Sequence, residues 1–125
     1  MGYANLYAGW IGVFLGFVAG AIPGLFFDKD DWLGGYGSWR RRMIRLAHIS
    51  FFGIGFINVL FALTIAHMEL YTVTPISSWL LIVGAITMPV LCYLSAYRKV
   101  FRHLFFIPVL CLLIGTGLLI LKGFL

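Results

Sequence analysis

Two histidines are the residues whose type and position could support a cofactor. His48 lies three residues after Arg45, and His103 directly follows Arg102. Neutral imidazole is a good axial ligand for haem iron, and guanidinium groups pair with propionates or phosphates. These residues predict a b-type haem with His48 and His103 as axial ligands and Arg45 and Arg102 as propionate or lipid-phosphate contacts. No metal other than this haem iron is expected.

Other occupants fit the same residues. A quinone head group or an anionic lipid phosphate could replace the haem, and interfacial histidines often do no more than reach toward water. The chain has no H-E-x-x-H zinc motif and no glycine-rich phosphate loop. Cys92 and Cys111 stand alone, and all four carboxylates fall in loops or at the ends of apolar stretches. The sequence therefore predicts no catalytic residue and no catalytic activity of its own.

The elements that must position these residues are membrane helices. The mean hydropathy is +1.04, with 62% hydrophobic and only 10% charged residues, which is far outside the range of soluble domains. A membrane-spanning helix needs about 20 consecutive, mainly apolar residues. Such stretches occur at about residues 6–27, 42–67, 76–97 and 101–121. Because the connections are short, the sequence predicts an all-α, single-domain, four-transmembrane-helix up-down bundle over residues 1–125.

Local signals mark the ends and bends of these helices. Thr74 followed by Pro75 is typical of a helix start, with Thr as the cap and Pro in the first turn. Pro23, Pro89 and Pro108 each lack a backbone N–H, so a bend or a helix end is expected near each of them.

The cations predict the orientation. Eight of the nine Lys and Arg residues lie in two segments, 29–45 and 98–102, and the connection at 68–75 has none. Cation-rich loops stay in the cytoplasm. We therefore expect a multi-pass protein of the bacterial inner (cytoplasmic) membrane with both termini outside the cytoplasm. The second and fourth spans would then run in the same direction, with His48 and His103 at similar depth. If these spans are neighbours, the two histidines could share one ligand.

Small residues line one face of the first span. Ala8, Gly12, Gly16, Gly20 and Gly24 follow one another at intervals of four, which places them on one side of a helix. Such a ladder allows close approach of another helix. We expect packing through the Gly12-Gly16-Gly20-Gly24 face, with other membrane subunits as partners.

Asn58 is a polar residue near the middle of the second span. An asparagine at this depth usually forms a hydrogen bond with a neighbouring helix. It is therefore expected to contribute to packing.

Two functions follow from these patterns. The first is a small integral-membrane subunit of a larger bacterial complex, related to electron transfer. It would act as a structural anchor and hold a haem b or quinone between spans two and four. The alternative is a small self-associating transporter or channel with Asn58 in its polar path. The spans carry no carboxylate for proton coupling. Nucleic acid is not an expected partner, because there is no soluble basic domain.

Overall fold

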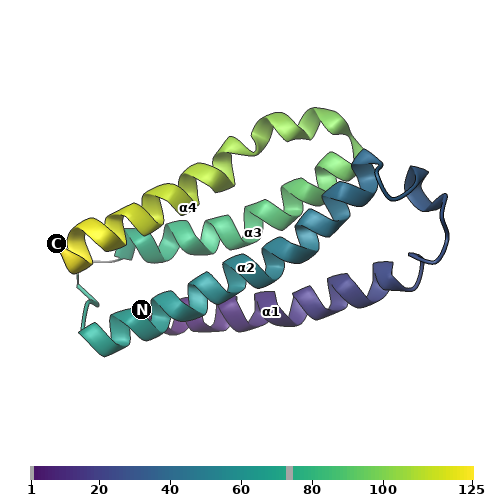
Figure 1. Cartoon of the computed structure of the whole chain (residues 1–125). Helices are drawn as coiled ribbons and strands as arrows, with labels where there is room; N and C mark the ends of the chain where they lie inside the picture. Colours follow the sequence, from purple (N-terminus) through teal and green to yellow (C-terminus); the bar gives the residue numbers. More distant parts are fainter. Residues whose placement is uncertain (1, 73–74) are drawn as a thin grey trace.

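The computed structural model describes residues 2–72 and 75–125, and within them all regular secondary structure is helical. Four segments are long and apolar enough to cross a membrane (Figure 1). They are α1 (Gly2–Gly24), α2 (Trp39–Met68), α3 (Pro75–Tyr97) and the segment Lys99–Phe124, which contains α4 (Phe106–Leu119). In α2 the candidate membrane span ends at His67. The chain is therefore a multi-pass membrane protein, and the predicted four-helix fold is confirmed.

The helix boundaries differ from the predicted ones by a few residues. α1 starts at Gly2 and ends at Gly24, directly after Pro23. α2 starts three residues earlier than predicted, because the Oγ of Ser38 caps the helix and accepts a hydrogen bond from the backbone N–H of Arg41 at 3.2 Å. α3 starts at Pro75, as the sequence predicts, whereas the proposed cap Thr74 lies outside the described residues.

The fourth span is a composite of three helical elements. A 3₁₀ helix, η2 (Lys99–Leu104), precedes α4, and a π-helical turn, η3 (Ile120–Phe124), follows it. Pro108 sits in the first turn of α4, where the loss of its N–H is tolerated. The predicted uniform span at 101–121 therefore begins inside a tighter helix that precedes α4.

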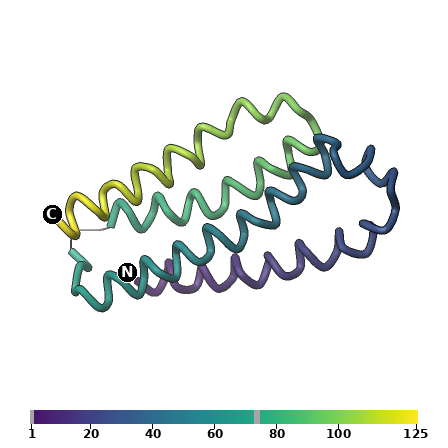
Figure 2. Tube along the Cα trace, viewed as in Figure 1, coloured from purple at the N-terminus to yellow at the C-terminus, as the bar shows by residue number. Residues whose placement is uncertain are grey.

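Sequential helices pack as neighbours. α1 packs on α2, α2 on α3 and α3 on α4, with a smaller contact between α1 and α3. Figure 2 shows both termini at one end of the molecule. The connection from α1 to α2, with the short 3₁₀ helix η1 (Trp32–Gly34), lies at the other end, as does the turn between α3 and η2. α1, α2 and α3 form a three-helix unit, and α4 packs on its α3 side.

Glycines bring α1 and α2 into backbone contact. A methyl group added at Gly9 would lie 2.6 Å from the carbonyl oxygen of Gly55, and one added at Gly55 would lie 2.9 Å from the carbonyl oxygen of Gly9. One at Gly12 would lie 3.2 Å from the carbonyl oxygen of Phe51. This close approach is the geometry that small residues permit between membrane helices.

The predicted ladder is thus occupied by a helix of the same chain. The side chains of Phe52 and His48 cover Gly16 and Gly20, whereas no atom lies within 4 Å of a methyl group added at Gly24. The prediction that other membrane subunits pack on this face stays a prediction. Within the chain, α2 covers the face from Gly12 to Gly20.

Candidate functional site

His48 lies on the face of α2 that packs against α1. Its Nδ1 is 2.8 Å from the carbonyl oxygen of Gly16. A carbonyl oxygen only accepts, so Nδ1 carries the proton and the lone pair of the neutral ring is on Nε2. The imidazole also meets the ring of Phe52 edge-on, with 5.1 Å between centroids. The half-buried side chain is therefore fixed in orientation and tautomer by α1 and by its own helix.

Gly20 makes room for this imidazole. A methyl group at Gly20 would lie 2.4 Å from Cε1 of His48. A cavity of about 200 Å³ adjoins the ring, with Gly20, His48 and Arg45 in its wall. Arg45 uses its guanidinium elsewhere: Nη1 donates to the carbonyl oxygen of Tyr36 at 3.0 Å, and the group stacks 4.2 Å above the Tyr36 ring.

His103 lies in a different part of the molecule. It is an exposed residue of η2, and η2 packs against α3. Both α2 and α4 pack on α3, whereas the interpretation above required the second and fourth spans to be neighbours. The structure therefore does not bring His48 and His103 together within one chain. Arg102, also exposed, has Nη1 at 3.4 Å from the carbonyl oxygen of Lys99.

A buried polar network joins three helices at the end that carries the termini. Asn5 Nδ2 donates to Oδ1 of Asn58 at 2.8 Å and to the carbonyl oxygen of Ser78 at 3.2 Å. Ser78 Oγ donates in turn to Oδ1 of Asn5. Both asparagines are completely buried. This network ties α1, α2 and α3 together, and its polar atoms satisfy one another.

The side-chain amide N–H groups of Asn58 also form hydrogen bonds inside the bundle. Its Nδ2 donates to the carbonyl oxygens of Ile54 at 3.0 Å and Leu81 at 3.1 Å. A side chain that is wholly buried and bonded at both ends does not line a water-filled path.

Asn58 was predicted to contact a neighbouring helix, but its partners were not predicted. Asn5 precedes the predicted first span, and Ser78 lies at the start of the predicted third span. The sequence does contain a pattern that indicates a contact at Asn5, because Asn5, Gly9, Gly12 and Gly16 share one helical face.

Cations and aromatic rings alternate at the opposite end. Arg41 is only 3% exposed, and its Nη2 donates to the carbonyl oxygen of Lys29 at 2.6 Å. Its guanidinium lies 5.3 Å from the ring of Trp32 and 5.6 Å from that of Phe27, and its Nε has no hydrogen-bond partner. This arginine anchors the connection between α1 and α2 to the first turn of α2.

Trp39 connects α2 to α3 at the same cationic end of the bundle. Its Nε1 donates to the carbonyl oxygen of Ser95 at 2.7 Å, which links α2 to α3. The cationic groups of Lys99 and Arg42 lie 5.0 and 5.7 Å from its ring. The tryptophan therefore orders positive charge at the level of the membrane interface.

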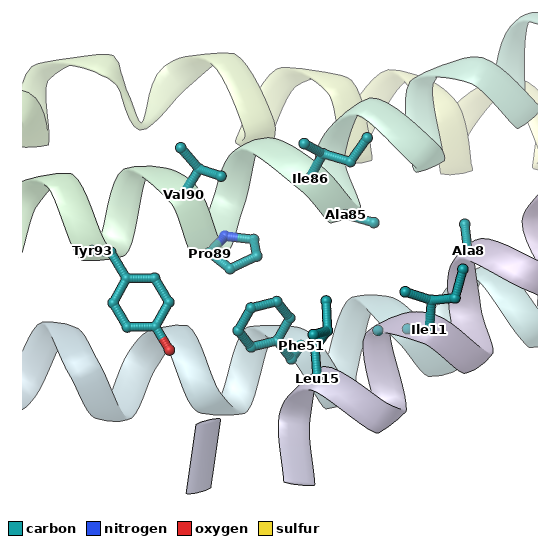
Figure 3. Close-up of a pocket in the computed structure, with 11 residues that line it drawn as sticks. Ala8, Ile11, Leu15, Phe51, Ala85, Ile86, Pro89, Val90 and Tyr93 are labelled. Atoms are coloured by element: carbon teal, nitrogen blue, oxygen red, sulfur yellow. The ribbon is translucent and has the colours of Figure 1, made fainter. Parts of the chain in front are cut away.

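Two larger cavities flank the α2–α3 pair. One, of about 410 Å³, is apolar and lies between α1 and α3 over Phe51 and Gly55 of α2 (Figure 3). The other, of about 510 Å³, lies at the cationic end, and its wall includes Arg40, Trp39 and Lys99. These two cavities and the His48 cavity are three places in the described residues where a ligand could bind.

Among the described residues, no group of three or more His, Cys, Asp and Glu side chains could hold a metal ion. Comparison with protein-family models, curated proteins and solved structures gave no match for this chain.

Proposed function

We propose that this protein is a non-catalytic integral-membrane subunit that anchors part of a larger complex in the bacterial cytoplasmic membrane. The observation that carries the proposal is the closed polar network of Asn5, Asn58 and Ser78. It makes α1, α2 and α3 a fixed scaffold and leaves Asn58 no role in a polar path. The alternative of a small transporter or channel required Asn58 in its polar path and is therefore less well supported.

The surface left over favours assembly with other proteins. α4 packs on α3 at one edge of the bundle. Its far side exposes large apolar side chains, among them Leu113 and Ile114, and α1 likewise exposes Trp10 and Phe14. Aromatic and aliphatic faces of this kind suit either lipid or a partner helix. Because the glycine face of α1 is already covered by α2, partner subunits would use these outer faces.

The orientation we propose follows from the ends of the bundle. The two cation-rich segments lie at one end, and both termini lie at the other. With the cationic end in the cytoplasm, both termini are outside it.

An electron-transfer role rests on His48. Its Nδ1–H is held by a backbone carbonyl, an arrangement common in histidines that bind a metal through Nε2. A haem b or quinone at this position would take its second contact from a neighbouring subunit, since His103 of the same chain lies on η2. Arg45 lines the cavity, and its guanidinium would leave the carbonyl oxygen of Tyr36 to pair with a propionate.

The test is purification of the tagged chain from its native membranes in a mild detergent. We expect partner subunits to copurify in fixed stoichiometry, and their loss when Leu113 and Ile114 are both changed to Ser. A chain that runs alone in every detergent and crosslinks only to itself would contradict the subunit proposal. An absorbance spectrum of the same complex tests the haem: a Soret band that shifts on reduction and is lost in His48→Ala is expected. A colourless complex would remove the haem and leave the anchor role intact.

A further inference from the structure

The cationic cavity has the features of a head-group site. It is about 510 Å³ in volume and lies between the start of α2 and the end of α3. Arg40 and Lys99 contribute positive charge and Trp39 an aromatic wall. Arg40 and Lys99 are exposed, and the ammonium group of Lys99 lies 5.0 Å from the centroid of the Trp39 ring, so a ligand would meet both charges at the surface.

The charge at this end is unbalanced. The two cation-rich segments carry eight Lys and Arg side chains against three aspartates, whereas Lys122 and Glu69 cancel at the other end. An anion at the cationic end therefore gains electrostatic energy, and the abundant anions at a membrane interface are phospholipid phosphates.

The apolar cavity continues the same face toward the membrane centre. On α3 the apolar cavity is lined by Ile86, Val90 and Tyr93, and the cationic cavity by Tyr97. Their spacings of four, three and four keep them on one side of the helix. On α2, Arg40 and Phe51 lie eleven residues apart, which is three turns plus roughly 20°. These two residues therefore lie on nearly the same side of α2.

The length of this path matches one leaflet. From Tyr97 to Ile86 the helix rises about 16 Å, at about 1.5 Å per residue. Half of a typical hydrocarbon core is about 15 Å. The path runs from charged and aromatic residues at the interface to a wall that is almost entirely apolar at mid-membrane, which is the polarity order of a phospholipid. Pro89 and Ile86 of α3 face Phe51 and Ile11 across this cavity (Figure 3).

We propose that this face binds one anionic phospholipid of the cytoplasmic leaflet. The phosphate pairs with Arg40 and Lys99, and one acyl chain lies along α3 into the apolar cavity between α1 and α3. The site goes beyond the anchor role and does not depend on it, because it is built from a single chain.

The experiment uses the full chain, delipidated in a neutral detergent, with phosphatidylglycerol or phosphatidylcholine added in mixed micelles. The readout is thermal unfolding as a function of lipid concentration. We expect phosphatidylglycerol to stabilise the protein more than phosphatidylcholine does. The double variant Arg40→Gln, Lys99→Gln should bind phosphatidylglycerol roughly thirtyfold more weakly, as the loss of two interfacial cations predicts.

The matched control removes two cations outside the cavity. Arg98→Gln with Arg102→Gln lowers the charge of the same end equally, and both residues are exposed. This variant should keep most of the phosphatidylglycerol effect. An equal loss in both double variants would reduce the effect to diffuse charge and overturn the site.

The acyl chain has a test of its own. Ala85→Phe fills the apolar cavity, whereas Val83→Phe adds the same ring at an exposed position outside it. Only the first should weaken binding of long-chain phosphatidylglycerol, and neither should change binding of the dihexanoyl form. Equal stabilisation by the two lipid classes, or full stabilisation by inorganic phosphate alone, would overturn the proposal of a phospholipid site.

Discussion

The side-chain amide of Asn5 donates to the side-chain oxygen of Asn58, 2.8 Å away, across the interface of α1 and α2, and neither residue is exposed. The same amide nitrogen of Asn5 reaches the backbone of Ser78 on α3. In hydrocarbon an unpaired amide is costly, so each asparagine requires the other. This relationship fixes the register of three helices with respect to one another.

The coupling between the two asparagines is measurable. We expect Asn5→Ala and Asn58→Ala each to destabilise the protein. The double variant should lose less than the two added together, with a coupling energy of about 0.6–1.7 kcal/mol. The measurement is unfolding of the four proteins by SDS in mixed micelles. Strictly additive effects would show that the bond contributes nothing to stability.

Two adjacent serines provide a matched pair. Ser78 donates to Asn5 within the network, whereas Ser77 is equally buried and its Oγ has no hydrogen-bond partner. Ser78→Ala should therefore cost about 0.6–1.7 kcal/mol. Ser77→Ala removes an unsatisfied hydroxyl and should be neutral or stabilising. The same unfolding assay compares them. A larger loss for Ser77→Ala would contradict this assignment of roles.

The length of the apolar stretches made the fold predictable, whereas the contacts between side chains of different helices were harder to predict. Four apolar stretches of membrane length and the proline at position 75 were enough to locate the helices. The neighbour relationships were not readable in the same way: spans two and four run in one direction, yet α3 is the neighbour of both. Matched depth alone therefore could not decide whether His48 and His103 meet. Gly20 could be recognised as a small residue, but that it accommodates His48 depends on the rotation of α2 against α1.

Helical glycines with and without a neighbour should respond oppositely to a methyl group. At Gly9 the added Cβ would lie 2.5 Å from Cγ2 of Val59 and 2.6 Å from the backbone oxygen of Gly55, so the helices must move apart. We expect Gly9→Ala to cost about 1–3 kcal/mol. At Gly53 there is no atom within 4 Å, and Gly53→Ala should be neutral or stabilise by up to about 1 kcal/mol. Equal effects at both positions would argue against the close α1–α2 contact.

The proposed orientation predicts the location of two reporters. A phosphatase fused after Leu125 should be active, because it would lie outside the cytoplasm, and one inserted near Gly35 should be inactive. A cytoplasmic reporter at the same sites should give the reverse pattern. The physical reason is the retention of cationic segments on the cytoplasmic side. Activity of the phosphatase near Gly35 would invert the whole arrangement, including the leaflet assigned to the phospholipid.

The indole N–H of Trp39 is predicted to hold the cationic ends of α2 and α3 together. Trp39→Phe keeps an aromatic face for Lys99 but removes the donor to Ser95, so the carbonyl of Ser95 loses this partner. A loss of about 1 kcal/mol is expected. Trp79→Phe serves as the control, because Trp79 is 69% exposed.

A second readout separates the bond from general packing. A disulfide engineered between the first turn of α2 and the last turn of α3 should form more slowly in Trp39→Phe than in the parent protein, since the two ends separate more often. Trp79→Phe should leave that rate unchanged. If both variants alter the rate equally, the hydrogen bond from Trp39 to Ser95 is not what holds these helix ends together.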